Sequence, residues 1–325
     1  MGEFKFYLAP MLDVTTPHFR RFLRTINKEV ILFTEMIVAE TVLHTSDEKL
    51  KEIIGFFDDK TIVQIGGSNP LNIAAAITKV HTIFGYKDFN LNCGCPSSKV
   101  KKGNFGASLM LMPQVVIDII NEVYEKTGFI MSLKIRIGVD ENDSYIFFKN
   151  FIEEIVSRTM CKTFFVHARK CWLSGLSPLQ NRTIPCLNYD FVYKIKDEYP
   201  NCNFILNGGI SSPEQLNLKK NLDGFMIGRA AIKDPFIFDK FIEMYRNNIS
   251  KAIEIDYICR NLIGYFKSYG SDTLVRHHHI FPLLNIFHGR NGTKKFKNFL
   301  VETVQKKINF DGFVEMIEEY FLAKN

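Results

Sequence analysis

The sequence predicts a (β/α)8 TIM barrel with a C-terminal all-helical domain. Through the first three-quarters of the chain, short apolar runs alternate with longer amphipathic stretches, a repeat that closes into a barrel of parallel strands. The length of 325 residues suits a barrel of roughly 250 residues with a modest appendage. After residue 248 the strand pattern stops, and the remainder is charged, amphipathic and helical. The alternation alone also allows a doubly wound open sheet.

The same alternation places each element along the chain. Strands are expected at residues 4–8, 30–33, 61–65, 89–91, 131–135, 163–166, 203–206 and 224–227. Helices are expected at residues 72–84, 114–127, 145–158, 190–199 and 230–247. We therefore expect a barrel domain over residues 1–248 and a helical domain over residues 249–325.

Composition indicates a globular protein with a large core. Hydrophobic residues make up 46% of the chain and charged residues 23%. No apolar run approaches the roughly 18 residues that a membrane span requires, and the N-terminal MGEFKFYLAPM enters strand-like sequence at once, so neither a membrane segment nor a leader peptide is expected. The seven cysteines are odd in number and irregularly spaced, which favours reduced thiols and a cytoplasmic location.

The net charge of +6 is concentrated toward the C-terminal end. Against Glu302 alone, the basic residues of this segment are Arg276, Arg290, Lys294, Lys295, Lys297, Lys306 and Lys307. Such a segment is a candidate phosphate-binding face, because each lysine that neutralises a nucleic-acid phosphate releases counterions. A solvated helix face is the other interpretation that composition allows.

The strand exits are where function is expected, because a barrel builds its active site at the C-terminal ends of its strands. Nearly every exit has residues that do not belong in a core. They are Ala9-Pro10-Met11, Glu35, Gln64 with Gly66 and Gly67, Asn92-Cys93-Gly94-Cys95-Pro96, Lys134 with Arg136, His167 with Arg169, Asn207-Gly208-Gly209, and Gly228-Arg229. Convergence of eight such exits on one rim predicts a binding site.

The last two exits are suited to a phosphate. Glycine lets backbone N–H groups approach an anion, and Asn207-Gly208-Gly209 and Gly228-Arg229 supply both glycine and a cation. Together with Gln64 and Lys134, such a site suits flavin mononucleotide (FMN): the lysine would stabilise negative charge on the reduced ring, and the glutamine amide would pair with its polar edge. The residues alone are equally compatible with a sugar phosphate.

Eight stretches resemble, in order, the signature blocks of the tRNA-dihydrouridine synthases. They are LAPMLDVT, TEMI, VQIGGSNP, LNCGCPSSKVKKGNFGASLM, LKIRIG, VHARKCWLSGLSPLQNR, ILNGGI and DGFMIGRAAIKDP. The basic RHHHIFPLLNIFHGRNGTKKFKNF resembles the family's C-terminal RNA-binding region. The long HARKCWLSGLSPLQNR loop followed by IPCLNYDFVYKIK is similar to the A subgroup, which modifies position 20 and its neighbour 20a in the D-loop.

The resemblance implies an FMN-dependent reductase that converts uridine to dihydrouridine in tRNA, with NADPH or NADH restoring the reduced flavin. Carried over by matching position, the FMN contacts fall on Ala9, Pro10, Met11, Gln64, Lys134, His167, Asn207, Gly208, Gly209, Gly228 and Arg229. The tRNA contacts fall on Leu179, Arg182, Lys294 and Lys297. Leu179 stands where relatives often have a basic side chain, and lysines replace arginines at 294, 295 and 297. Lysine cannot make the paired hydrogen bonds that arginine makes to a phosphate, so we expect these contacts to be less selective for the geometry of the RNA.

The resemblance also assigns the proton donor to Cys95, while Cys93 stands where relatives usually have an aliphatic residue. Reduction of uracil needs hydride at C6, from the flavin N5, and a proton at C5 from the opposite face. A thiol of ordinary pKa, about 8.5, is protonated at pH 7 and can act as a general acid. Asn92 is expected to hold the pyrimidine edge and Arg169 its polar face or the neighbouring phosphate. The base must first leave the tRNA stack, which costs a few kcal/mol.

Neither a metal nor an obligate protein partner is expected. The CxC pair lacks the second pair that a zinc site needs. His277, His278 and His279 are consecutive, so on a helix they face different directions and are expected to be surface or RNA-facing residues. Two other functions stay open: an FMN barrel that reduces a small free pyrimidine, as dihydroorotate dehydrogenases act on one, and a tRNA-binding module without catalysis.

Overall fold

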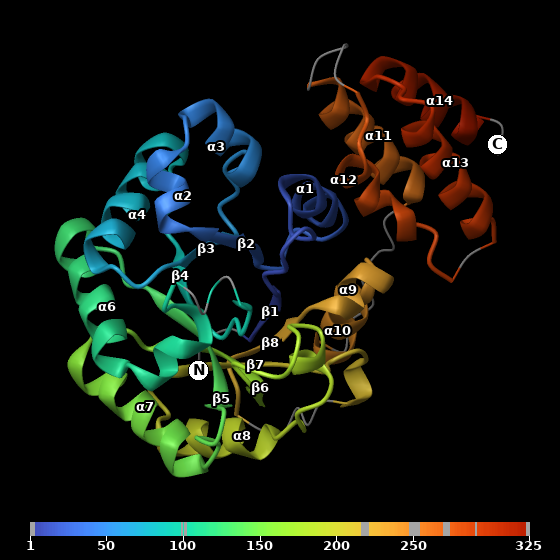
Figure 1. Ribbon diagram of the computed structural model, residues 1–325. Coiled ribbons are helices and arrows are strands. Elements are labelled where there is room, and N and C mark those ends of the chain that lie inside the picture. The colour runs from blue at the N-terminus through green and yellow to red at the C-terminus, as the bar shows by residue number, and fades with distance from the viewer. Residues whose placement is uncertain are drawn as a thin grey trace. The chain divides into compact units, whose positions relative to one another are not determined.

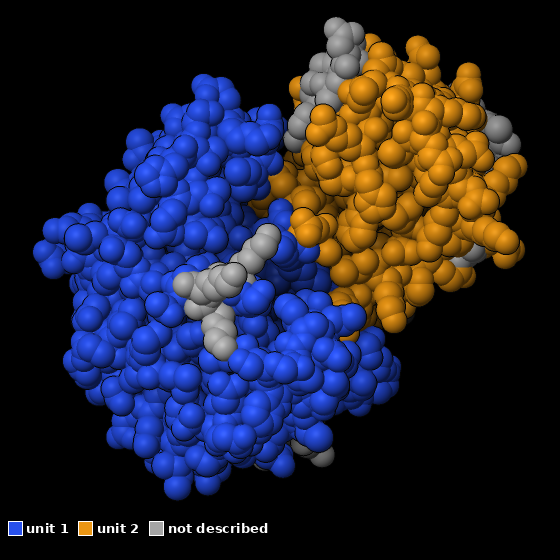
Figure 2. Space-filling model, viewed as in Figure 1, with its two compact units in different colours: residues 1–12, 31–228 blue, residues 13–30, 229–325 orange. Residues whose placement is uncertain are grey.

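The computed structural model describes residues 4–98, 100, 103–215, 221–246, 254–268, 274–289 and 291–322 (Figure 1). Their contacts divide the chain into two compact units (Figure 2). The barrel unit comprises residues 1–12 and 31–228, and the helical unit comprises residues 13–30 and 229–325.

Eight parallel strands form the barrel unit. They are β1 (Lys5–Leu8), β2 (Leu32–Val38), β3 (Thr61–Gly66), β4 (Phe89–Cys93), β5 (Ser132–Val139), β6 (Thr163–Cys171), β7 (Asn203–Asn207) and β8 (Gly224–Ile227). Their order is β1-β8-β7-β6-β5-β4-β3-β2, with every pairing parallel. The seam between the two end strands is bridged just before β2, where Ile31 N–H donates to Phe6 O (3.0 Å) and Ile31 O accepts from Leu8 N–H (2.9 Å). The TIM barrel is confirmed, rather than an open sheet.

Helices connect these strands. They are α2 (Ala39–His44), α3 (Asp47–Ile54), α4 (Pro70–Phe84), α6 (Pro113–Thr127), α7 (Tyr145–Arg158) and α8 (Tyr189–Glu198), with short 3-10 turns η1 (Gly106–Leu111), η2 (Gln180–Arg182) and η3 (Pro213–Gln215). The residues at both ends of helix α4 explain where it begins and ends. Asn69 caps its first turn by accepting from Asn72 N–H (3.0 Å), Pro70 occupies the first position, and Gly85 ends it in the left-handed region at φ +81°.

An apolar layer lies inside the barrel below the polar rim. Phe165 of β6 lies between Tyr7 and Phe33, with ring centroids 4.9 and 5.0 Å away, and it is joined by Ile205 and Met226. Side chains alternate along a strand, so two residues further on, at position 167, the chain faces the same interior. The strand register therefore puts the polar residues of the rim directly above a dry core.

Several strands extend beyond their predicted ends. β2 continues through Glu35, β5 continues past Lys134 to Val139, and β6 continues past His167 and Arg169 to Cys171. The predicted ends at residues 33, 135 and 166 are too early, because Glu35, Arg136, His167 and Arg169 lie within these strands. In a barrel a polar side chain can face the interior near the open end without ending the strand.

The helical unit contains α1 (Pro17–Ile26), α9 (Arg229–Lys233), α10 (Ile237–Arg246), α11 (Ile255–Lys267), α12 (His277–Ile280), η4 (Phe281–Asn285), α13 (Thr293–Gln305) and α14 (Phe310–Leu322). The single helix expected at 230–247 is two helices, because Pro235 cannot continue the first of them. Asn27, just after α1, donates to Asp239 Oδ1 (2.7 Å), which ties residues 13–30 to this unit. The domain boundary at residue 248 stays a prediction about separately folding domains. In the part of the chain described, no helix has both the length and the apolar character needed to cross a bilayer.

Candidate active site at the barrel rim

A chain of side-chain amides lies inside the barrel near the ends of β3 and β4. Gln64 is fully buried, and its Nε2 donates to Asn90 Oδ1 (2.8 Å) while its Oε1 accepts from Asn92 Nδ2 (2.8 Å). Asn90 passes the chain to β5 by donating to Ser132 Oγ (2.9 Å). Because each amide orients the next, the hydrogen-bond donors and acceptors of these side chains are already oriented in the absence of a ligand.

Asn92 also orders the loop that carries Cys95. Its Oδ1 accepts from Gly94 N–H (3.1 Å) and Cys95 N–H (3.0 Å), a local turn that competes with continuation of the strand. On the other side, Cys95 O accepts from Ala107 N–H (2.9 Å). Cys95 is half-buried, whereas Cys93 within β4 is fully buried, and burial raises the pKa of the Cys93 thiol. Of the two, only the Cys95 thiol is accessible.

Arg136 of β5 holds the same loop from below. Only 3% of its surface is exposed, and its guanidinium donates to three backbone carbonyls: Gly94 O (2.9 Å), Lys170 O (3.1 Å) and Asn181 O (2.9 Å). One buried cation thereby joins the loop after β4, the end of β6 and the long loop that follows it. Sequence reasoning placed Arg136 at a strand exit but gave it no role.

Lys134 and Asn207 meet across the barrel interior, from β5 and β7. Lys134 Nζ donates to Asn207 Oδ1 (3.2 Å), and Asn207 Nδ2 donates to Met226 O (2.8 Å), which fixes the orientation of the amide. Burial lowers the pKa of Lys134 to about 7, and the neighbouring positive charge of Arg136 adds to the effect, while Cys95 opposes it. An ammonium group of this kind is stabilised when an anion binds beside it.

The turn after β7 contains two consecutive glycines, Gly208 and Gly209. Gly208 and Gly209 have φ angles of +117° and +70°, a region that side chains other than glycine rarely adopt. A Cβ at Gly208 would lie 2.7 Å from His167 Cδ2, so the imidazole of His167 lies directly against the backbone. Tyr189 supports the turn from outside by donating to Gly208 O (2.6 Å).

The ends of β8 and β1 lie next to each other, and β8 is also the neighbour of β7 in the sheet. Ala9 N–H donates to Ile227 O (2.8 Å), and a Cβ placed on Gly228 would meet Ala9 Cβ at 3.6 Å and Met11 Sδ at 3.7 Å. These are ordinary contact distances, so the protein's own packing does not require glycine at position 228. Pro10 follows β1, and Arg229 begins α9 in the helical unit.

Residues 172–188 form the long loop after β6. Asn181 is fully buried and organises it, accepting from Trp172 N–H (2.8 Å) and donating to Trp172 O (2.9 Å). Arg169 donates to Pro185 O. Leu179, 57% exposed, and Arg182 lie on its surface.

A cleft of about 760 Å³ lies between this loop and the loop that carries Cys95. Its walls are Pro96, Ser98 and Asn104 on one side and residues 173–178 on the other. A volume of this size accommodates a nucleotide-sized group. The cleft begins at the residue directly after Cys95, so a group bound in it lies beside the thiol-bearing turn.

The remaining predicted RNA contacts lie in the helical unit. Lys294 and Lys297 lie on α13, the first exposed and the second half-buried. Arg290 lies outside the described residues. His279 is 5% exposed, so the expectation of a surface residue is wrong for it: helix α12 turns this side chain inward.

The donor set at the rim fits FMN. Lys134 supplies a cation, Gln64 and Asn207 supply amides, and Gly208 and Gly209 supply a left-handed turn without side chains, whose backbone N–H groups could approach a phosphate. The structure brings Gln64, Asn92 and Cys95 into one hydrogen-bonded group, Lys134 and Asn207 into a second, and His167 and Gly208 into a third.

A closed parallel barrel with a half-buried cysteine, hydrogen-bonded amides and a buried lysine near the C-terminal ends of its strands has the arrangement of a TIM-barrel enzyme. Residues 7–321 match the dihydrouridine synthase (Dus) family. The chain belongs to this family and is therefore an oxidoreductase.

Three curated relatives support the assignment, each named tRNA-dihydrouridine(20/20a) synthase. The relative from Shewanella oneidensis is 34% identical over 93% of this chain and 89% of its own length, and the one from Xylella fastidiosa is 36% identical over 94% and 91%. The relative from Synechocystis is 40% identical over 76% and 75%. Among solved structures, CdNal from Clostridium difficile in complex with mannosamine aligns with 95% of this chain and 100% of its own, at 13% identity and a TM-score of 0.47. The barrel itself is established by its strand pairing.

Proposed function

We propose that this chain is a tRNA-dihydrouridine synthase that reduces the C5=C6 bond of uridine 20, alone or together with its neighbour 20a, in the D-loop of tRNA. Reduced FMN bound at the rim, regenerated by NADPH or NADH, would supply the hydride for C6 of the base. Cys95 donates the proton to C5, and other residues of the chain orient the base and bind the RNA. A cytoplasmic location fits a reaction on tRNA.

One observation supports this proposal above the others. The relatives of this chain are named for this reaction. Of the two cysteines of the CxC pair, Cys95 is the one that is not fully buried. Its turn is hydrogen-bonded through Asn92 to the buried side-chain amide of Gln64. A general acid must be held within hydrogen-bond reach of the atom that it protonates. Asn92 and Ala107 bond the Cys95 backbone itself, and Arg136 bonds the carbonyl of the preceding residue, Gly94.

The other rim residues then bind and orient. Lys134, Asn207, His167 and the backbone of Gly208 and Gly209 hold the cofactor, together with Gln64, Ala9, Pro10, Met11, Gly228 and Arg229. Asn92 and Arg169 face the base or its neighbouring phosphate, in addition to the contacts that each makes within the protein. The cleft beside Cys95 accommodates the extruded nucleotide, and Arg182 in the barrel unit and Lys294 and Lys297 in the helical unit contact the RNA backbone; Leu179, in the same loop as Arg182, also contacts the RNA.

The test compares Cys95→Ala with Cys186→Ala, a matched change at an exposed cysteine outside the proposed site. Each purified protein is incubated with unmodified tRNA and NADPH, and dihydrouridine is quantified by mass spectrometry after nuclease digestion. We expect Cys95→Ala to lose about 10²-fold or more of its rate, the usual contribution of a general acid, while it keeps its flavin absorbance. Cys186→Ala should match the unsubstituted protein in both.

Full activity of Cys95→Ala would refute the role of the thiol. The same incubation with free uridine or free uracil tests the substrate class, since a reductase of small pyrimidines would turn them over as fast as tRNA. Tight tRNA binding without any NADPH oxidation would instead identify a binding module.

A further inference from the structure

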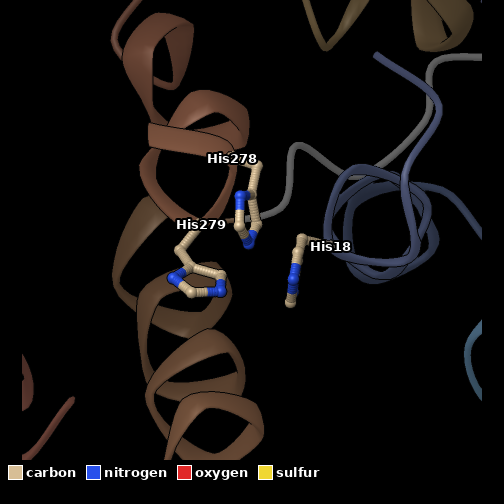
Figure 3. A group of neighbouring side chains, drawn as sticks. All are labelled: His18, His278 and His279. Carbon is tan, nitrogen blue, oxygen red and sulfur yellow. The ribbon is translucent and has the colours of Figure 1, made fainter. Parts of the chain in front are cut away.

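Three imidazoles from distant parts of the sequence converge within the helical unit. His18 comes from α1, and His278 and His279 come from α12; each offers one ring nitrogen, and these nitrogens all lie within 4.8 Å of one another (Figure 3). The ring centroids of His278 and His279 are 4.0 Å apart, and those of His18 and His279 are 4.7 Å apart. His277, the preceding residue, is outside the cluster.

We propose that His18, His278 and His279 form a binding site for one divalent transition metal ion, of which zinc is the representative. Zinc binds imidazole nitrogen at 2.0–2.1 Å, so in a tetrahedral site the ligand nitrogens lie about 3.3 Å apart. The three rings therefore need to approach one another by on the order of 1.5 Å or less, a change within reach of side-chain rotation. The exposed edge at His278 gives the ion a path in and leaves a fourth position for water.

The protonation state of the cluster suits a metal. Metal binding requires neutral imidazole, and burial is the main cause that lowers the pKa of His18 to about 4 and of His279 to about 3. Protons therefore do not compete for these rings near neutral pH. The Tyr265 hydroxyl lies 3.0 Å from His18 Nδ1 and can accept its N–H, which leaves Nε2 as the ligand and fixes the ring orientation.

His279 must rearrange its hydrogen bond when a metal binds. Its Nδ1 accepts the N–H of Arg276 (3.0 Å), so in the neutral ring the proton is on Nε2. Ligation through Nε2 transfers that proton to Nδ1 and breaks the contact with Arg276. The loss is one backbone hydrogen bond, a smaller contribution than that of a metal–nitrogen bond in a structural site.

The type of ligand selects the class of metal, because all three ligands are imidazoles and no carboxylate is among them. The positive side chains of Arg20 and Arg276, which act on His18 and His279, oppose binding of any cation, so the imidazole–metal bonds must outweigh them. Magnesium and calcium, which bind through oxygen, are disfavoured, whereas zinc, nickel and copper bind well to imidazole. A bound ion would join α1 to α12 and stabilise the helical unit by mass action.

The test uses the full-length flavoprotein after chelator treatment, titrated with Co²⁺ as a spectroscopic substitute for zinc. Imidazole-bound tetrahedral Co²⁺ absorbs at wavelengths longer than those of flavin, and zinc then displaces it. We expect one equivalent per chain for the unsubstituted protein and for the matched control His277→Ala, each with a higher melting temperature when zinc is added. His278→Ala and His278→Gln, which change an exposed ligand and should fold normally, should bind at least tenfold more weakly and lose the thermal shift.

Three results would overturn the proposal. They are the absence of a Co²⁺ band at one equivalent, an equal loss of binding in His277→Ala and His278→Ala, and intense near-ultraviolet bands of Co²⁺–thiolate coordination. The last result would assign the ion to a cysteine, such as the exposed Cys186. Because the readouts are metal absorption and melting temperature, they are independent of activity on tRNA.

Discussion

Among single residues, Arg136 joins the loop that carries the proposed proton donor to the end of β6 and to the long loop that follows it. Its buried guanidinium makes three charge-assisted hydrogen bonds, to Gly94 O, Lys170 O and Asn181 O, and no carboxylate in the part of the chain that the structure describes forms an ion pair with it. If the guanidinium is removed, these carbonyls stay buried and lose their donor, and the loop that carries Cys95 loses its support from below. The expected consequence is a combined loss of stability and of catalytic geometry.

We expect Arg136→Met to lower the free energy of unfolding by about 3 kcal/mol and to reduce kcat on tRNA more than it raises KM. Arg136→Lys is the matched control, because it keeps the charge but offers a single point donor in place of the planar fork. It should recover part of the stability and little of kcat. Denaturant unfolding and steady-state kinetics measure the two effects, and an Arg136→Met protein with unchanged kcat would exclude a positioning role.

Lys134 predicts a pH dependence of cofactor binding. Its pKa of about 7 in the ligand-free protein means that it is cationic below pH 7 and neutral above, and a bound anion raises that pKa. From pH 7 to pH 9 the phosphate of FMN is already a dianion, so affinity for reduced FMN should fall by up to about tenfold per pH unit as Lys134 loses its proton. Anaerobic fluorescence titration of Lys134→Met should show weaker binding and a flatter profile. Equal slopes in both proteins would contradict the assignment.

For single residues, the sequence predicts which side chains lie at the rim of the barrel but not which backbone groups they contact. Gln64, Lys134 and Asn207 are visible as polar residues that interrupt apolar strands, and they do lie at the interior end of the barrel. The contacts of Arg136 and Asn181 are with main-chain carbonyls of separate loops, and no pattern in the sequence encodes a carbonyl partner. One signal is available for Arg136, because it falls two residues after Lys134 and so shares its interior face.

At the scale of elements, the turn after β7 shows how backbone conformation prepares a site. Gly208 has a φ of +117° and its missing Cβ leaves room for the His167 ring, so both strain and contact exclude a side chain. Gly128, at the end of α6, is a suitable comparison because it has a φ of +73° and nothing within 4 Å of its missing Cβ.

Gly208→Ala and Gly128→Ala therefore separate strain from steric conflict at the cofactor site. Gly128→Ala should cost about 1 kcal/mol of stability and leave the flavin content unchanged. Gly208→Ala should cost more, displace His167, and reduce the ratio of flavin to protein absorbance severalfold. Normal flavin content in Gly208→Ala would show that the turn does not contact the cofactor.

The elements themselves were predicted with uneven accuracy. Strand β8 and helix α7 have the bounds that the pattern predicts, because apolar periodicity and glycine or serine boundaries agree there. The predicted ends of β5 and β6 are too early, because both strands carry polar residues toward the barrel interior. That residues 13–30 group with the C-terminal helices could not be read from the sequence, since the partners Asn27 and Asp239 are separated by 212 positions.

For the whole molecule, the distribution of charge is the feature that bears on tRNA. The surplus of lysine and arginine between residues 276 and 307 equals the net charge of the chain, so the rest of the protein is near neutral. Binding that depends on phosphate contacts weakens as salt displaces them, and each lysine contact contributes a slope of about one in a plot of log affinity against log salt.

The double variant Lys294→Ala/Lys297→Ala should reduce that slope by about two and weaken tRNA binding regardless of sequence. A double variant of two exposed lysines in the barrel unit, Lys51→Ala/Lys87→Ala, keeps the change in net charge and should leave the slope within error of the unsubstituted protein. Filter binding across a range of salt concentrations distinguishes the two. Equal slope changes in both variants would indicate a net-charge effect without a defined contact face.

The most direct measurement of the central claim maps reduction along the tRNA. Unmodified tRNA is incubated with the purified protein and NADPH, digested to oligonucleotides, and analysed by mass spectrometry position by position. Our account predicts a gain of two hydrogens at uridine 20, or at 20 and 20a, and nowhere else in the D-loop. Reduction confined to other positions, or none in a protein that retains its flavin and oxidises NADPH, would contradict it.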